Sequence, residues 1–199
     1  LRYHGVKGVT IKFSGNKGFH IAVPFESFPE TVQGQPIKDM FPEAPRRMAA
    51  YLKHLIAKPI KEEILKKEGS DLGKIANNLD IGVEKIKLSK EDGKLDLNPD
   101  PFIEMDTLLI SSRHLYRMPY SFHEKSELIS VPIDPDKVLD FEKEMAEPDK
   151  VKVSHNFLER NVERGEASKL LVQAFDFQPV VEGEKTDYKD KKFEMPEEA

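Results

Sequence analysis

Apolar and polar residues alternate on both sides of a glycine-containing turn near the start of the chain. Residues 9–13 and 19–23 each place apolar side chains at every second position, and side chains along a strand point to opposite faces with that period. Between the two runs, residues 15–18 contain two glycines, which permit the positive φ angles of a tight turn. This pattern predicts a β-hairpin.

Polar side chains gather on one face of this predicted hairpin. If Phe13 and Phe19 share the buried face, Ser14 and His20 share the other one, next to Lys17 in the turn. A hydroxyl, an imidazole, an ammonium and two glycine N–H groups can cradle an anion such as phosphate. Gly-x-x-Gly turns are common, however. The hairpin taken alone therefore favours a simpler interpretation, a polar tip with a hydrogen-bonded histidine.

A helix with one apolar face is predicted further along the chain, after a proline-rich loop over residues 24–42. From Glu43 to about Lys58 the apolar residues recur at helical spacing. Pro59 should end or kink this helix, the pattern continues to residue 67, and Gly69 is a suitable stop. The opposite face is either solvated, which is the commoner case, or follows a phosphate backbone. Its basic residues are Arg46, Arg47, Lys53, Lys58, Lys61, Lys66 and Lys67.

A second informative block runs from residue 102 to residue 134, after a polar region over 70–100 in which we expect a short helix or two. The pattern predicts a strand over 102–106, a helix over 107–118 and a strand over 128–133. Asp106 then lies at a strand end, where sheets display functional groups, or it caps the following helix. We expect Tyr51, Tyr116 and Phe122 to lie in the core rather than to stack on bases, and Arg113 and His114 to be structural.

The last part of the chain carries weaker signals. We expect helices over 136–145, 154–164 and 166–175. Residues 182–199 are acidic and rich in lysine, which predicts a mobile tail. The chain therefore divides into a main domain over 1–145 and a helical extension over 146–199.

Composition narrows the possible functions. Hydrophobic residues make up 38% of the 199 positions and charged residues 34%, and no apolar run is long enough to span a bilayer. The net charge of −5 leaves no global field that would attract nucleic acid, so any such contact must be local. Without cysteine there is no disulfide and no cysteine-ligated zinc. No signal peptide is recognisable, and the first residue, Leu1, leads us to expect a piece of a longer protein.

Two blocks of the sequence resemble the archaeo-eukaryotic primases. Residues 14–20, SGNKGFH, are similar to the S-G-x-x-G-x-H motif of that family. Residues 113–134, RHLYRMPYSFHEKSELISVPID, resemble the stretch that follows the third motif of the small catalytic subunit. That stretch has the pattern H-L-hydrophobic-basic-x-P-x-S-hydrophobic-H-x-K-[ST] and leads into a V-P-I-like strand. The blocks occur in the family's order, with an aspartate before the second, and residues 145–199 hardly take part.

The resemblance implies a two-metal nucleotidyltransferase. Members of the family join nucleotides on a template with two Mg²⁺ or Mn²⁺ ions, which three carboxylates hold. The third of these carboxylates matches Asp106, with Glu104 as a second candidate. The other two belong to a D-x-D motif upstream of the position of Ser14, where this chain has no acidic residue. The zinc-binding cysteines of many relatives are also absent, and the spacing from Asp106 to HLYR is about one residue short.

The same resemblance assigns roles to the remaining candidates. His20, a candidate catalytic residue together with Asp106, would bind the triphosphate of the incoming nucleotide with Ser14. His123 and Lys125 would bind the phosphates from the other side. Relatives often carry two basic residues in the turn and one at the position of Arg117, which here either binds phosphate or only pairs with an acid. The implied nucleotide-binding residues are Ser14, Asn16, Lys17, His20, Arg117, His123 and Lys125.

The expected fold is therefore α/β or α+β, with a central mixed or antiparallel sheet flanked by helices, as in the primase catalytic core. The expected function is template-directed primer synthesis from NTPs on single-stranded DNA, with a large primase subunit as partner and no membrane. We expect a cytoplasmic protein, or a nuclear one in a eukaryote. Three alternatives remain: a non-catalytic relative that binds nucleotide or nucleic acid, a repair-type primase-polymerase, and an unrelated interaction domain.

Overall fold

The computed structural model describes residues 1–78, 80–89, 95–107, 110–113 and 115–177 of the chain. Its α-helices are α1 (Glu43–Glu68), α2 (Leu72–Asn78), α3 (Val83–Ile86) and α4 (Ser168–Asp176). Its strands are β1 (Thr10–Phe13), β2 (Phe19–Ala22), β3 (Thr31–Val32), β4 (Gln35–Pro36), β5 (Lys87–Ser89), β6 (Leu95–Leu97) and β7 (Pro132–Ile133). Its 3₁₀ turns are η1 (Arg2–His4), η2 (Phe25–Ser27), η3 (Ile37–Met40), η4 (Asp100–Phe102), η5 (Val138–Asp140) and η6 (Lys143–Ala146).

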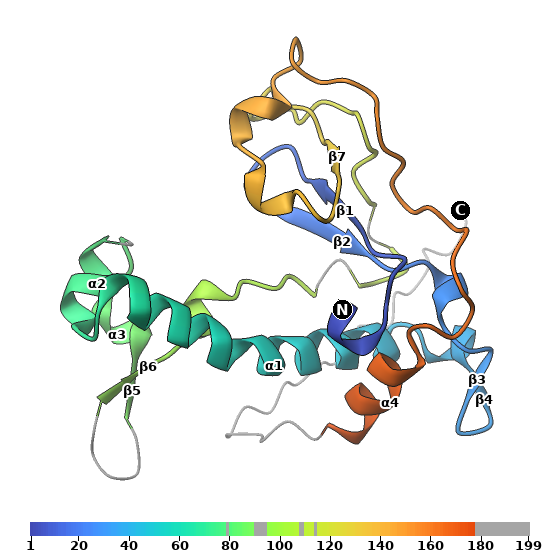
Figure 1. Ribbon diagram of the computed structural model, residues 1–199, viewed down its shortest axis with the longest axis horizontal. Helices are drawn as coiled ribbons and strands as arrows, with labels where there is room; N and C mark the ends of the chain where they lie inside the picture. Colours follow the sequence, from blue (N-terminus) through green and yellow to red (C-terminus); the bar gives the residue numbers. More distant parts are fainter. Residues whose placement is uncertain (79, 90–94, 108–109, 114, 178–199) are drawn as a thin grey trace, which may run out of the picture.

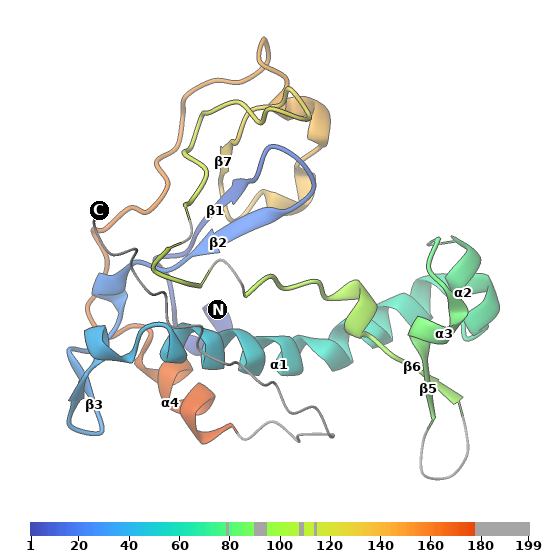
Figure 2. The same ribbon diagram turned by 180° about the vertical axis from the view of Figure 1, so that it is seen from behind.

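The long helix α1 carries a separate group of elements near each end (Figure 1). At one end lie α2, α3 and the β5–β6 hairpin, and near the other lie α4 and the β3–β4 hairpin. Figure 2 shows from behind that the sheet of β1, β2 and β7 stands to one side of α1. Helices and small antiparallel sheets together make a mixed architecture that is compatible with the predicted α+β class.

The predicted hairpin is confirmed, and its register defines two faces. β1 lies in the middle of the three-stranded sheet and pairs antiparallel with β2 and β7. Phe13 is opposite Phe19, with ring centroids 5.8 Å apart, and Lys12 is opposite His20. Phe141 packs on the rings of Phe13 and Phe19, on the face opposite His20. Phe13 is buried but Phe19 is 44% exposed, so the two do not share a buried face as the alternation suggested.

Hydrophobic contacts at both ends hold α1 as one continuous helix. Pro59 does not end it, although proline removes one backbone hydrogen bond. At one end, Ile64 and Leu65 pack on a cluster formed by Ile75, Ala76, Ile86 and Leu97. At the other end, Met48, Tyr51 and Leu52 pack on Val6, Ala167 and Leu170. Gly69 ends the helix as predicted, with φ of +84° and its N–H donated to Leu65 O.

The C-terminal helix α4 shares its core with the start of the chain. Leu170 and Ala167 pack with Val6, and Leu171 packs with Ile37 and Ala44. The predicted helix over 166–175 is thus present with slightly shifted bounds. The predicted mobile tail, 182–199, lies outside the described residues.

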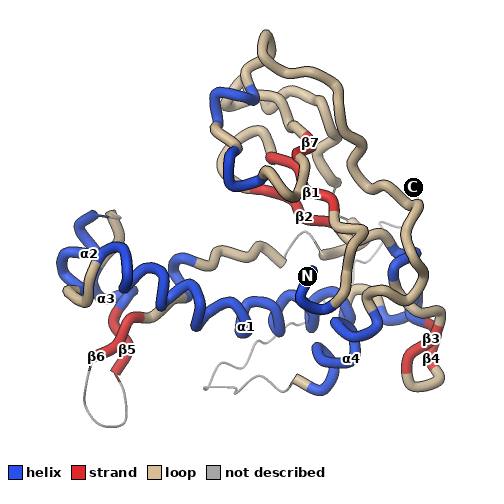
Figure 3. Tube along the Cα trace, in the orientation of Figure 1, coloured by secondary structure: helices blue, strands red, loops and turns tan. Residues whose placement is uncertain are grey.

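Several predicted elements between residues 102 and 164 are wrong. The predicted strand over 102–106 is absent, because Phe102 belongs to η4 and residues 103–107 are irregular. In the described part of 107–118 there is no helix, and the predicted helix over 154–164 is an irregular segment. The predicted helix over 136–145 consists of the two turns η5 and η6. Figure 3 shows that loop makes up most of the chain around β7 and up to α4.

Candidate functional site

Ser14 organises the hairpin turn through its side chain. Its Oγ accepts hydrogen bonds from the N–H groups of Asn16 and Gly18, each at 3.3 Å, and its own N–H donates to Gly18 O at 2.8 Å. The N–H of Gly18 therefore points to Ser14, which corrects the expectation that both glycine N–H groups face an anion. The hydroxyl proton of Ser14 has no acceptor among the described residues, so it is available to a ligand.

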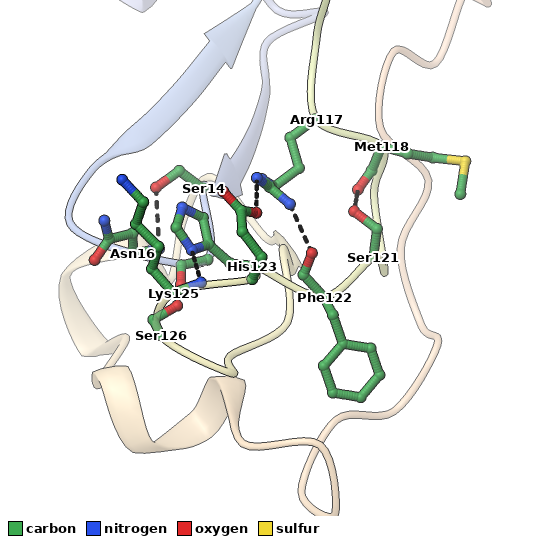
Figure 4. A network of polar contacts seen from close by, with 11 residues as sticks. Ser14, Asn16, Arg117, Met118, Ser121, Phe122, His123, Lys125 and Ser126 are labelled. Carbon is green, nitrogen blue, oxygen red and sulfur yellow. Dashed lines mark hydrogen bonds and ion pairs between the residues drawn. The ribbon is translucent and has the colours of Figure 1, made fainter.

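The two sequence blocks that carry the family resemblance lie against each other (Figure 4). Gly15 has φ of +91°, and a Cβ at this position would lie 2.9 Å from Cβ of His123. The hydroxyl of Ser126 donates to the carbonyl oxygen of Gly15. These contacts place the turn of the hairpin directly on the turn that contains His123 and Lys125.

The turn over residues 123–128 holds its own residues by short-range hydrogen bonds. His123 N–H donates to Leu128 O at 2.8 Å, and Lys125 N–H donates to Nδ1 of His123 at 3.3 Å. Figure 4 shows that Lys125 comes from the same turn as His123 and Ser126. The contacts of Gly15 with His123 and Ser126 put the turn that follows Ser14 against the turn that carries His123 and Lys125.

Arg117 connects this turn to the His20 face of the sheet. Its guanidinium donates to Phe122 O at 2.6 Å and to Oε2 of Glu124 at 2.7 Å. The ion pair between Arg117 and an acid, which the sequence left open, is thus present. A backbone hydrogen bond and, secondly, the hydrogen bond from Arg117 hold the pKa of the Glu124 carboxyl below its usual range. The positive charge of Arg117 also helps to lower the pKa of His20.

His20 lies half-buried against an aromatic wall. Its ring centroid is 4.6 Å from that of Tyr116, which stacks on Phe157 at 5.7 Å. Nδ1 of His20 is buried and has no hydrogen-bond partner in the described part of the chain, which leaves Nε2 as the atom that can reach a ligand. Burial, and secondarily the charges of Lys12 and Arg117, lower the pKa of His20 to about 4, so the imidazole is neutral at pH 7.

Lys12 is the residue of this face that the sequence did not single out. Its side chain is fully buried, and its Nζ donates to Oγ of Ser130 at 2.9 Å. The ammonium lies 4.9 Å from the ring centroid of Tyr116 and 5.5 Å from that of Phe157. Burial lowers the pKa of Lys12 to about 8 and raises that of Tyr116 to about 12. The one available signal was the strand alternation, which places Lys12 on the same face as His20.

Acid should destabilise the fold through His20. The unfolded chain takes up a proton at His20 near pH 6.5, whereas the folded chain does so only near pH 4. The unfolded state therefore binds more protons at His20 in this window, so the His20 contribution to stability should be complete above pH 6.5 and should decline as the pH falls toward 4. Urea unfolding between pH 4 and 8 measures this. The decline should be smaller in His20→Gln, and an equal decline in both proteins would contradict the assignment.

The predicted metal ligand Asp106 does not lie at a strand end. Asp106 and Glu104 are both exposed within an irregular segment. The charge of Asp106 raises the pKa of His20, but burial, Lys12 and Arg117 lower it by more. Within the described ranges no three His, Cys, Asp or Glu side chains are grouped so that they could hold a metal ion. Asp106 is therefore not joined, in the described part of the chain, by the two further carboxylates that the resemblance requires.

The other candidates have more peripheral positions. Lys17 is exposed at the tip of the hairpin, and Asn16 is partly buried beside it. Tyr116 and Phe122 are 44% and 60% exposed, so the expectation that they belong to the core is wrong. Tyr51 does pack at the edge of the core, Arg113 is exposed, and His114 lies outside the described residues.

Comparison with protein-family models, curated proteins and solved structures gives no match for this chain. Over the part of the chain that the structure describes, no helix has the length and apolar character of a membrane span.

Proposed function

We propose that this chain carries the nucleotide-binding part of a nucleotidyltransferase of the archaeo-eukaryotic primase type. In this proposal it holds the triphosphate of an incoming NTP during template-directed primer synthesis on single-stranded DNA. The observation that supports it most is the packing of Gly15 on His123, which joins two blocks about a hundred residues apart in the sequence. If the two resemblances were due to chance, there would be no reason to expect the two segments to contact each other in the fold.

The chemistry of the joined blocks suits a polyphosphate. Ser14 has a hydroxyl proton to donate, His20 has a neutral ring, and Lys125 is an exposed lysine. Hydrogen bonds from such donors to phosphate oxygens are charge-assisted and therefore stronger than neutral ones. Asp106 would be the carboxylate of this chain that ligates Mg²⁺ or Mn²⁺ when bound. The large primase subunit remains the partner that we expect.

Removing either side of the phosphate site should weaken NTP binding. His20→Ala and Lys125→Ala should each lower the affinity for ATP by roughly tenfold to a hundredfold, because a charge-assisted hydrogen bond contributes about 1.5–3 kcal/mol. Calorimetric titration measures the affinity, and the double variant should lose less than the sum if both residues hold one ligand. Lys38→Ala, on an exposed lysine of η3, is the matched control.

The same titration separates the alternatives. Failure of the unmodified chain to bind any NTP would favour an unrelated interaction domain and would contradict the proposal. NTP binding without incorporation, even when a D-x-D segment is supplied, would favour the non-catalytic relative. A preference for dNTPs and for gapped or broken DNA would favour the repair-type primase-polymerase.

A further inference from the structure

The fully buried ammonium of Lys12 has no carboxylate within ion-pair distance among the described residues. Its polar partner is the hydroxyl of Ser130, which in turn donates to Phe13 O at 2.9 Å. An ammonium has three N–H donors, so one hydroxyl does not satisfy it. The rings of Tyr116 and Phe157 add cation–π attraction from one side.

This arrangement is unfavourable for folding. Burying a charge without a counter-charge loses its hydration, and a hydrophobic side chain of similar volume is often neutral or stabilising at such a position. Neither the hydroxyl nor the two rings carry a negative charge. The fold by itself therefore gives no reason for a lysine in the central strand of the sheet.

The location of Lys12 suggests a function for its charge. Lys12 is the cross-strand neighbour of His20, and its Nζ lies over the ring of Tyr116, which contacts His20. Its charge acts on His20, and the charge of Arg117 acts on both. The charges of Lys12 and Arg117 thus bring positive potential to the His20 face of β1 and β2, against the opposing charges of Glu124 and Asp106, in a chain whose net charge is −5.

We propose that Lys12 is a positioning residue whose buried charge, together with Arg117, attracts the phosphates of a nucleotide to His20 without touching them. The inference rests on the proposed function, since it concerns the same ligand. The low polarity around Lys12 keeps water and salt from screening its charge, so the attraction persists where that of a surface lysine would fade. The attraction should also grow with the negative charge of the ligand.

The variant Lys12→Met tests this, because methionine keeps an unbranched side chain of similar length and removes the charge. Calorimetric titrations with ATP, ADP and AMP, without divalent cations, provide ligands whose charge falls in that order. The affinity for ATP should fall by roughly tenfold, as expected for unit charges about 10 Å apart at an effective dielectric constant near 20. ADP should lose less and AMP least, and the thermal midpoint should stay the same or rise.

A second variant separates the charge from the packing. Ser130→Ala removes both hydrogen bonds of the buried hydroxyl and leaves the ammonium in place, so it should lower the thermal midpoint and keep the preference for ATP over AMP. An equal loss for the three nucleotides in Lys12→Met, no loss, or failure of that variant to fold would overturn the inference. If the unmodified chain binds none of the three nucleotides, the proposed function fails together with the inference. If the unmodified chain binds them and Lys12→Met keeps the same preference for ATP over AMP, the inference alone is overturned.

Discussion

Replacing Gly15 with alanine should destabilise the folded chain by about 2–5 kcal/mol. Two independent causes add up at this position. The φ of +91° lies in the left-handed region, where a side chain costs about 1–2 kcal/mol. The new Cβ would also lie 2.9 Å from Cβ of His123, and relieving such an overlap in a packed contact costs about 1–3 kcal/mol.

Urea unfolding measures this loss, and Gly18→Ala in the same turn is the matched control. A Cβ at Gly18 meets no atom within 4 Å, and its φ is outside the left-handed region, so this variant should change stability little. Because the overlap separates Ser14 from His123, Gly15→Ala should also weaken ATP binding. Equal stability of the two alanine variants would contradict the packing of the hairpin on the 123–128 turn.

The second large effect is expected at Glu166, and it concerns stability alone. Glu166 Oε1 accepts hydrogen bonds from the N–H of Gly8 at 2.8 Å and from the hydroxyl of Ser27 at 3.0 Å. Ser27 is fully buried, and its carbonyl oxygen accepts the N–H of Ala167. One carboxylate therefore connects the segment before β1, the turn η2 and the start of α4.

Glu166→Ala should lower the free energy of unfolding by about 2–4 kcal/mol, since each donor left unsatisfied costs about 1–3 kcal/mol and water reaches part of the site. Glu166→Gln keeps an acceptor oxygen and should lose less. Glu163→Ala is the control, because Glu163 is exposed and forms an ion pair with Lys7 at 3.9 Å, a type of contact that contributes little. Chemical unfolding of the three variants measures the difference. Similar losses for Glu163→Ala and Glu166→Ala would show that the carboxylate is not a connecting group.

The periodic segments of the sequence determined their own local structure. The apolar residues of the hairpin, α1 and α4 recur with the period of a strand or a helix, and each segment forms the element that its period predicts. Within the hairpin, the register pairs Phe13 with Phe19 and Lys12 with His20, as the alternation requires. The residues of the two family-like blocks, including Ser14 and His123, were likewise recognisable from the order of residues alone.

The described residues of the segment 102–123 could not be predicted in this way, because their tertiary contacts are with residues distant in the sequence. Leu115 is 94% exposed, so an apolar residue that suggested a buried helix face is not buried. Tyr116 instead turns toward Lys12 and His20. Proline at 119 disfavours a helical conformation in the residue before it, and in the described part of 107–118 the contacts of Tyr116 with Lys12 and His20 are made without a helix.

Only the tertiary structure decided which polar residues of the hairpin lie inside. Strand alternation placed Lys12 and His20 on one face, but it gave no sign that this face is covered. The covering side chains, Tyr116 and Phe157, and the partner of Lys12, Ser130, come from the second half of the chain. Burial and the resulting pKa values depend on these neighbours, and Ser130 is 118 residues away from Lys12 in the sequence. An alternation pattern covers only a few neighbouring residues. It therefore cannot indicate that residues more than a hundred positions away bury the charge of Lys12.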